Sequence, residues 1–411
     1  MSTAVRGRLS QLRSRARQRN FIVYAVLLAG ALMWPSIAGF MTNGNATALI
    51  SQGADAGVYV LLAIGLNVVV GFAGLLDLGY AAFFAIGAYT AGMLASGQLG
   101  ASPLHHEVHL PFWLVLFLAM FIAASFGAIL GAPTLRLRGD YLAIVTLGFG
   151  EIVPRIFRNM GFGSPLGNWT SGINGINALD RPSLPFWFTG PWVNQPFQLV
   201  PNYDFSFDPV PFYVLMVILV IACVILVNNL QRSRIGRAWM AVREDEVAAA
   251  AMGVNTVTTK LLAFGIGAAF SGFAGAYYGT KLSLVGPEAF SFVVSVTVLV
   301  MVVLGGMGNI PGVIVGAILI YYVLFSFLGN LPDYLTNLAQ QVGLGWLNQP
   351  NFAHNWPGLG NEVSLLPFLI FGLILVLIML LRPQGLLPSR TRAEELRKGV
   401  SQEAVADTQS T

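Results

Sequence analysis

Ten long apolar stretches, separated by polar segments, constrain the fold of this chain more than any other feature. A helix of about 20 apolar residues is long enough to cross the hydrocarbon core of a bilayer. Only 10% of the 411 residues are charged, against about 25% in a typical soluble protein. The sequence therefore predicts an all-α, polytopic membrane protein. The expected spans are Phe21–Phe40, Gly57–Gly74, Leu78–Gln98, Leu110–Ala132, Tyr141–Arg158, Val210–Leu230, Leu261–Thr280, Ser291–Gly305, Gly312–Leu328 and Ser364–Leu381.

The distribution of Lys and Arg predicts the orientation of these spans. If the N-terminus is cytoplasmic and ten helices follow, 18 of the 22 basic residues face the cytoplasm, leaving Arg155, Arg158, Arg181 and Lys281 on or near the outside. Cytoplasmic loops carry an excess of basic residues, and one span more or fewer would reverse every later loop. We therefore expect ten crossings with both termini in the cytoplasm, and we attribute the net charge of +4 to membrane orientation rather than to nucleic-acid binding.

Three regions are expected along the chain. Residues 1–20 form a basic cytoplasmic tail, 21–387 a transmembrane domain and 388–411 a polar cytoplasmic tail. The basic tail and the first apolar stretch also resemble a signal peptide, but the stretch is long and no Ala-x-Ala site ends it, which favours a retained helix. The outer segment Gly329–Val363 contains no Lys or Arg and is expected to have no core of its own.

Few polar residues interrupt the apolar spans. Asp77 lies between two of them, and a carboxylate at bilayer depth marks a site or pathway by default, although a position at a wet cytoplasmic turn is equally compatible with the sequence. Glu151 and Arg155 are four residues apart and can pair on one helix face, with Pro154 kinking the helix between them. Such a pair suits either a translocation path or, as we favour, the headgroup region.

Small residues recur every four positions in one span, at Gly267, Ser271, Gly275 and Gly279. This spacing lets another helix approach closely. The stripe indicates either a helix that slides during gating or static packing, and we favour static packing.

The segment Arg237–Gly253, in the cytoplasmic loop between two spans, predicts a short helix outside the membrane. Its alanines favour helix, the acidic Glu244, Asp245 and Glu246 suit the positive end of a helix, and Gly253 is a suitable stop. The alanine face is too weakly apolar to anchor in lipid.

No motif for chemistry is found. The chain contains no phosphate-binding Gly-rich loop followed by Lys and Ser or Thr, and no hydrolase, zinc-protease or kinase signature. We therefore expect neither an enzyme nor a bound cofactor. His105, His106, Glu107 and His109 cluster in an outer loop, but their spacing and exposure argue against a metal site.

Several of these segments together resemble the M-type permease subunit of branched-chain amino acid ABC importers, from about Gly57 to Leu387. The resemblance is carried by Gly65–Asn67 with Gly71–Gly79, Leu137–Tyr141 with Thr146–Gly148, Asn174–Ile176, Arg237–Gly253, Gly305–Gly308 and Arg382–Leu386.

The resemblance implies a permease of the bacterial inner membrane that pairs with a sister permease, two cytoplasmic ATPases that bind the ATP, and a periplasmic binding protein. It also implies that Arg237–Gly253 docks on the ATPase, with Arg237, Arg243, Glu244, Asp245, Glu246 and Gly253 as its key residues. Importers of this kind generally carry Glu six residues before the loop glycine, where this chain has Val247. Candidate residues for the translocation path are Asn67, Asp77, Thr146 and Glu151.

Two alternatives remain open at this stage. Urea and amide importers have very similar permease subunits. A secondary transporter is a different class, but it usually needs intramembrane charges, of which we identify almost none beyond Asp77 and Glu151.

Overall fold

The computed structural model describes residues 3–42, 46–134, 140–165, 167–182, 209–349, 358–363, 366–381 and 385–387. Almost all the regular structure in these ranges is helical, as predicted. The chain divides into two compact units, Met1–Val296 and Thr297–Thr411, and helix α11 (Phe292–Gly305) begins in the first and ends in the second.

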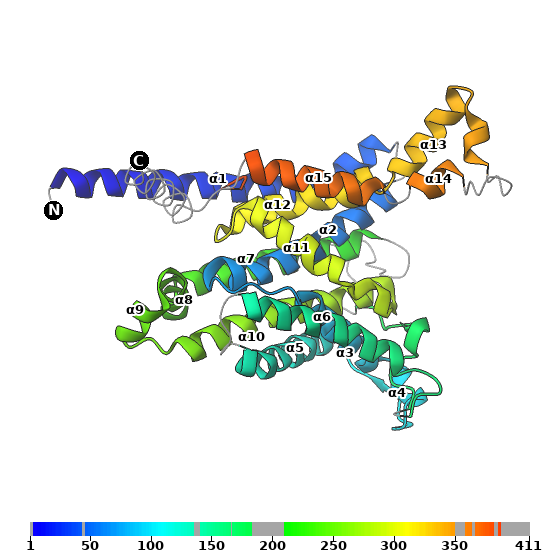
Figure 1. The fold of residues 1–411 in the computed structure, drawn as a ribbon, viewed down its shortest axis with the longest axis horizontal. Coiled ribbons are helices and arrows are strands. Elements are labelled where there is room, and N and C mark those ends of the chain that lie inside the picture. The colour runs from blue at the N-terminus through cyan, green and yellow to red at the C-terminus, as the bar shows by residue number, and fades with distance from the viewer. Residues whose placement is uncertain are drawn as a thin grey trace, which may run out of the picture. The chain divides into compact units, whose positions relative to one another are not determined.

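The first unit contains the long helices of the N-terminal and central chain (Figure 1). Its helices are α1 (Thr3–Met41), α2 (Thr47–Leu66), the π-helix η1 (Asn67–Phe72), α3 (Tyr80–Leu94), α4 (Gln98–Ala101), α5 (Phe112–Thr134), α6 (Asp140–Asn159), η2 (Gly172–Asn174), α7 (Pro209–Arg232), α8 (Arg234–Glu244), α9 (Glu246–Ala251), α10 (Thr256–Leu282) and η3 (Pro287–Phe290).

Two short antiparallel pairs of strands lie between these helices. Strand β1 (Ala95–Ser96) pairs with β2 (Val108–His109), and β3 (Ile176–Asn177) pairs with β4 (Leu284–Val285). The second pair fastens the segment after α6 to the end of α10, with Ile176 opposite Val285.

The second unit contains α12 (Ile310–Tyr321), the π-helix η4 (Tyr322–Leu328), α13 (Leu331–Gln341), η5 (Gly345–Asn348), α14 (Leu359–Glu362) and α15 (Leu366–Leu381). The segment after Gly329, predicted to be external, is therefore partly helical. Near its start, the Gly305–Gly308 turn binds the end of the described chain, since Leu386 N–H donates to Leu304 O at 2.7 Å and Asn309 Nδ2 donates to Leu387 O at 2.7 Å.

Within the described residues, six helical stretches are long and apolar enough to cross a membrane. They are Ile22–Met41, Thr47–Phe72, Phe112–Pro133, Pro209–Arg232, Thr256–Leu282 and Ile310–Gln341. Each of the ten predicted spans does contain an α-helix, but the count of ten crossings stays a prediction. The chain is a helical, multi-pass membrane protein.

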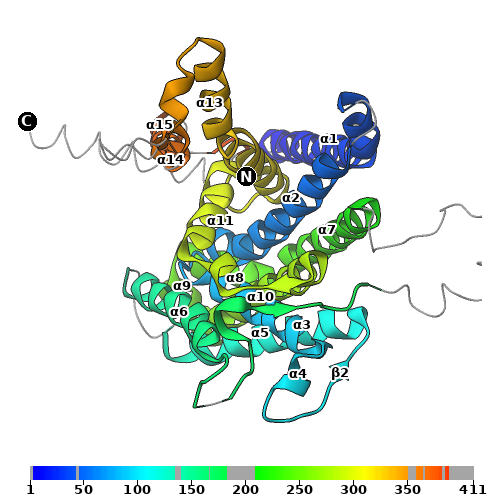
Figure 2. The ribbon, with the colours of Figure 1, turned by 90° about the vertical axis from the view of Figure 1, so that its right-hand side faces the viewer.

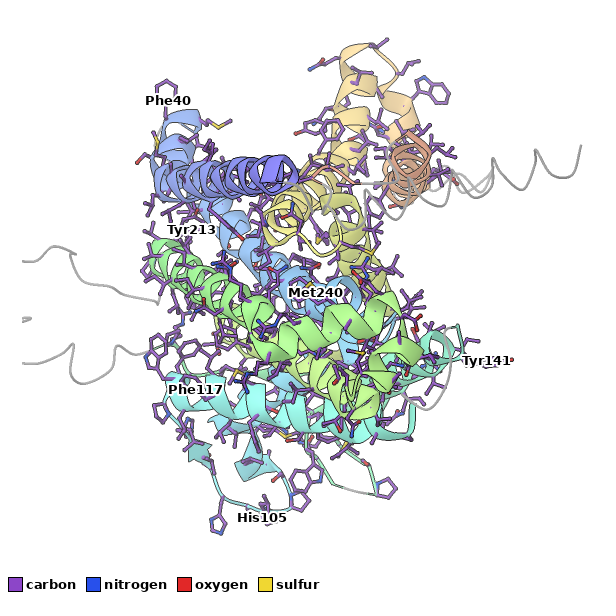
Figure 3. The ribbon with its side chains drawn as sticks, turned by 90° about the vertical axis from the view of Figure 1, so that its left-hand side faces the viewer. Phe40, His105, Phe117, Tyr141, Tyr213 and Met240 are labelled. Carbon is purple, nitrogen blue, oxygen red and sulfur yellow. The ribbon has the colours of Figure 1, made fainter. Side chains whose placement is uncertain are left out.

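Large apolar side chains cover the outside of the first unit, as expected for contact with lipid. Figure 3 shows Phe40, Phe117 and Tyr141 pointing away from the ribbon, and their exposed fractions are 87%, 58% and 70%. Helix α1 is continuous across residue 20, where the sequence suggests a boundary between tail and membrane domain.

Helix α10 forms the centre of the first unit, where it packs against both α3 and α5 (Figure 2). The contact with α3 is so close that a Cβ atom on Gly275 would lie 2.2 Å from Phe84 O, and one on Gly87 would lie 2.1 Å from Gly272 O. Two hydrogen bonds cross the same interface: Tyr80 Oη donates to Gly267 O at 3.0 Å, and Ser271 Oγ donates to Tyr80 O at 3.2 Å.

These contacts support the packing interpretation of the small-residue stripe. Ser271 and Gly275 face α3, whereas a Cβ on Gly267 would lie 2.3 Å from Val69 Cγ2 of η1. The four-residue spacing therefore lets α10 approach both of these elements closely.

We predict that Gly275→Ala destabilises the protein, because its Cβ would overlap the backbone of α3 and overpacking costs about 1–3 kcal/mol. The matched control on the same helix is Gly265→Ala, whose Cβ would lie 3.6 Å from Ala124 O, an ordinary contact. Thermal unfolding in detergent checks this. A Gly275→Ala variant as stable as Gly265→Ala would show that the α3–α10 interface adjusts easily.

Candidate functional site

The break between α2 and α3 brings together part of the predicted translocation path. Helix α2 continues as the π-helix η1, which begins at the fully buried Asn67, and an irregular segment then leads through Gly74 and Asp77 to α3. Single π-helical turns within α-helices often mark functional sites. This widened helical turn could not be predicted from the sequence, because π-helices have no distinctive composition.

Asp77 is buried, with an exposed fraction of 1%, so the expectation that it is exposed to water at a turn is wrong. Its Oδ1 accepts a hydrogen bond from Gly79 N at 2.9 Å. Helix α6 supplies the next contact: Thr146 Oγ1 accepts from Leu78 N at 3.1 Å and donates to Ala143 O at 3.1 Å. The hydroxyl of Thr146 thereby satisfies a backbone group in the segment that carries Asp77.

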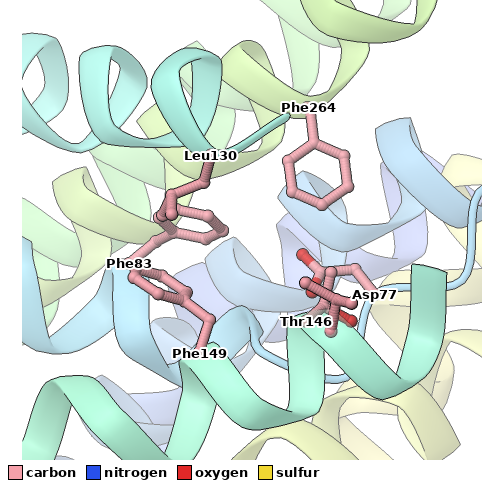
Figure 4. Close-up of a pocket in the computed structure, with 7 residues that line it drawn as sticks. Asp77, Phe83, Leu130, Thr146, Phe149 and Phe264 are labelled. Atoms are coloured by element: carbon pink, nitrogen blue, oxygen red, sulfur yellow. The ribbon is translucent and has the colours of Figure 1, made fainter. Parts of the chain in front are cut away.

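Asp77 and Thr146 line one small pocket in the first unit (Figure 4). The other lining residues are apolar: Phe83, Leu130, Val145, Phe149 and Phe264. The pocket measures about 30 Å³, enough for one or two waters and too small for an amino acid. In this conformation it is a small, largely apolar cavity with Asp77 and Thr146 in its wall rather than an open channel.

Glu151 is not part of this pocket. It pairs with Arg155 at 3.3 Å, as the spacing predicted, but the exposed fractions of the two side chains are 44% and 74%. This position agrees with the favoured interpretation of an exposed pair on α6, and the structure does not bring Glu151 to Asp77 and Thr146.

The predicted cytoplasmic helix is in fact two helices. Helix α8 ends at Glu244, and α9 begins after Asp245, whose Oδ1 accepts from Val247 N and Ala248 N, both at 2.9 Å. We therefore correct the expectation of one helix: Asp245 is the N-cap that starts a second one. Gly253 follows α9 with a φ of +85°, the left-handed conformation typical of a glycine stop.

Helix α8 is attached firmly to the membrane domain. Trp239 is fully buried and its Nε1 donates to Thr259 O at 2.7 Å, at the start of α10. Arg243 donates from Nη1 to Gly71 O in the α2–α3 break. Gly74, with a φ of +72°, lies beneath the aliphatic part of Arg243, where a Cβ would come within 2.8 Å of Arg243 Cγ.

Helix α9 is attached as well, because Glu246 pairs with Lys260 of α10 at 2.6 Å. Arg237 turns back to donate to Arg232 O at 2.8 Å. Of the acidic residues at this loop, Glu244, Asp245 and Glu246 are all exposed. The sequence alone did not indicate that Arg243 and Glu246 face the protein itself, since their partners lie far along the chain or beyond a turn.

A second polar cluster was missed by sequence reasoning. Lys281 of α10 pairs with Asp55 of α2 at 2.5 Å and also donates to Ser51 O at 2.8 Å. The 226 residues that separate Lys281 and Asp55 hid the pair, although an Asp two residues before the predicted span Gly57–Gly74 was a signal available in the sequence.

One member of the predicted histidine cluster, His109, contacts an acidic residue. Among the described residues, no group of three or more His, Cys, Asp or Glu side chains is placed to hold a metal ion. His109 Nδ1 lies 2.6 Å from Asp180 Oδ2. The hydrogen bond to Asp180 and its negative charge raise the pKa of His109, which favours the charged ring and an exposed ion pair across the loop.

Comparison with known proteins places this geometry in a family. Residues 49–340 match the family model described as the permease component of branched-chain amino acid transport systems. The chain belongs to this family. The model covers α2, the α2–α3 break, the α8–α9 loop and α10. It is a family of transport permeases, not of enzymes.

The chain is also similar in sequence to individual permease proteins of branched-chain amino acid transport systems. The chain is 38% identical over 394 residues to the high-affinity branched-chain amino acid transport system permease protein LivM of Escherichia coli (strain K12), covering 94% of this chain and 79% of the relative. It is 27% identical over 265 residues to the permease protein LivH of the same organism, with 64% and 79% covered. A probable LivM permease of Methanocaldococcus jannaschii is 25% identical over 360 residues, with 81% and 91% covered. No solved structure matches.

We predict that Thr146→Val weakens transport and lowers stability by about 1–2 kcal/mol, because it leaves the Leu78 N–H without its acceptor. Thr146→Ser keeps the hydroxyl and is the control. Thermal unfolding and uptake by the assembled transporter provide the measurements. Equal behaviour of the Val and Ser variants would mean that the Asp77 segment does not depend on this hydrogen bond.

Proposed function

We propose that this chain is a permease subunit of an ATP-driven importer that carries branched-chain amino acids across the bacterial inner membrane. Family membership supports the transport role, and the similarity to branched-chain amino acid permeases named LivM supports the substrate class. The similarity to both LivM and LivH proteins fits a complex in which this chain pairs with a sister permease.

In this proposal, ATP is bound by two separate cytoplasmic ATPase subunits, and a periplasmic protein delivers the substrate. The chain itself catalyses no reaction and needs no cofactor, which agrees with the missing phosphate-binding motif. Both termini lie in the cytoplasm, as the distribution of basic residues favours.

Besides family membership, the attachment of the α8–α9 loop to the rest of the first unit supports the proposal. Trp239, Arg243 and Glu246 fasten it to α10 and to the α2–α3 break. A loop attached at three points passes the movement of a bound ATPase on to the membrane domain, whereas a flexible loop would change its own conformation instead. Movement of an ATPase against this loop would reach the backbone at Gly71, six residues before Asp77.

The tip of the loop has the surface that a partner would need. Val247 and Met252 have exposed fractions of 79% and 85% outside the apolar spans. The exposed Glu244 and Asp245 flank this apolar spot. Apolar residues surrounded by polar ones are typical of a protein contact, and Val247 occupies the position where importers of this kind generally carry Glu.

The proposed function is tested by reconstitution. We expect ATP-dependent leucine uptake into proteoliposomes only when this chain is combined with its sister permease, the two ATPases and the binding protein. The chain alone should take up nothing, because it has no motif for binding ATP. Robust uptake by the chain alone, driven by a proton or sodium gradient, would favour a secondary transporter instead.

The proposed docking surface gives a separate prediction. Val247→Asp should lower recovery of the ATPase in a pull-down by about tenfold, since a charge replaces an apolar contact. Thr258→Asp adds the same charge to an exposed site in the first turn of α10 and should leave docking intact. If both variants bind the ATPase as the parent does, the tip of α9 is not the interface.

A further inference from the structure

The cluster around Asp55 and Lys281 forms a polar strip between two membrane spans, α2 and α10. It is part of neither the α8–α9 loop nor the pocket at Asp77. On α2, Gln52, Asp55 and Tyr59 follow one another at intervals of three and four residues, which places them on one helix face. On α10, Lys281 faces them. All four residues are partly exposed, although their neighbours Ala54, Ala56 and Val58 on α2 are buried.

The two charges at the centre of the strip are withdrawn from solvent to different degrees. The exposed fraction of the Lys281 side chain is 6%, and that of Asp55 is 27%. Lys281 donates to Asp55 at 2.5 Å and to Ser51 O at 2.8 Å. The more accessible carboxylate therefore gives an incoming cation a point of first contact.

Packing alone is a poor reason for such a pair. Removing two charges from water costs several kcal/mol per ion, and well-packed apolar residues often stabilise a protein as well or better. Among the ion pairs of the described residues, this is the one that joins two of the six long apolar stretches. Ionisable residues in such positions mark a pathway or ligand site by default.

A third polar atom in the strip is available to a ligand. Gln52 Oε1 is buried and accepts no hydrogen bond from the described residues. Gln52 lies one turn from Asp55 on the same helix face. A buried acceptor without a donor is unfavourable, so a ligand that brings N–H donors would gain free energy here.

We propose that Asp55 and Lys281 form a transient binding site for the zwitterionic head group of an amino acid. When their contact opens, the ammonium of the ligand donates to the Asp55 carboxylate and to Gln52 Oε1, and the carboxylate of the ligand accepts from Lys281 Nζ. The exchange replaces one neutral pair by two, so the net charge in the membrane does not change. This inference rests on the proposed import of amino acids.

The position in the helices fits an early step of import. Asp55 lies eight residues after the start of α2 at Thr47, or about 12 Å along the axis, and Lys281 lies at the end of α10. In the proposed orientation both are near the outer side. Asp77 lies beyond the other end of α2, so a substrate from outside would meet the Asp55–Lys281 pair first.

The deciding experiment neutralises both charges together. Asp55→Asn with Lys281→Gln leaves no unpaired charge behind, so a purely structural ion pair would be replaced with little loss of stability. A zwitterion site would lose both contacts. Asp55→Leu with Lys281→Met, measured in parallel, replaces the pair by apolar side chains of similar size.

Each variant is assembled with the sister permease, the ATPases and the binding protein, and the assembly is checked by gel filtration and thermal unfolding. Leucine uptake is then measured in proteoliposomes. We expect both double variants to assemble and to hydrolyse ATP at the basal rate, while uptake falls about tenfold or more, because two charge-assisted hydrogen bonds to the substrate are lost. Arg158→Gln, which removes the exposed pair with Glu288, is the control and should transport normally.

Two results would overturn the inference in distinguishable ways. If an assembled double variant imports leucine with unchanged KM and maximal rate, the Asp55–Lys281 pair is structural, and the proposed function still stands. If the unmodified complex imports no zwitterionic amino acid, both the proposed function and this site fail.

Discussion

The close approach of α10 to α3 and α5 is the interaction on which the rest of the first unit depends. Apolar side chains gain little free energy by moving from lipid into a helix–helix contact, because lipid tails are equally apolar. Helices in a membrane therefore associate through van der Waals contact and interhelical hydrogen bonds. Glycines at 87, 272 and 275 let the backbones touch, and Tyr80 and Ser271 bond across the interface. With α10 fixed in this way, Lys260 and Thr259 near its start bind α9 and α8, and Lys281 near its end binds α2.

The α2–α3 break is the other element around which function is organised. A regular helix would satisfy its backbone internally, but the π-helix and the irregular segment after it leave groups that other elements must bind. Arg243 binds one of them from α8, and Thr146 binds another from α6. The buried Asp77 lies between these two contacts. A single segment thus connects the α8–α9 loop to the pocket lined by Asp77 and Thr146. A movement of the loop would therefore act directly on the backbone next to this pocket.

The ion pairs of this chain illustrate how position decides what a charge does. Glu151 and Arg155 are exposed on one helix and contribute little, as surface pairs generally do. Glu246 and Lys260 join α9 to the start of α10 and limit the freedom of the α8–α9 loop. Asp55 and Lys281 lie between two membrane spans, where desolvation of the two charges costs free energy. A polar ligand that binds both charges would offset part of this cost. All three pairs join a carboxylate to a basic side chain, so the difference in their effects comes from their surroundings.

The sequence by itself determined the features that depend on local composition. Apolar length predicted helices in all ten places, the four-residue spacing on α10 predicted close packing, and Gly253 predicted a left-handed stop. Family motifs pointed to the permease function because they are short local patterns. Tertiary structure alone decided which polar groups meet. Arg243 is 172 residues from Gly71, and Lys281 is 226 from Asp55. No periodicity along the chain encodes such distances, because the partners are brought together by the packing of whole helices rather than by their own sequence neighbours.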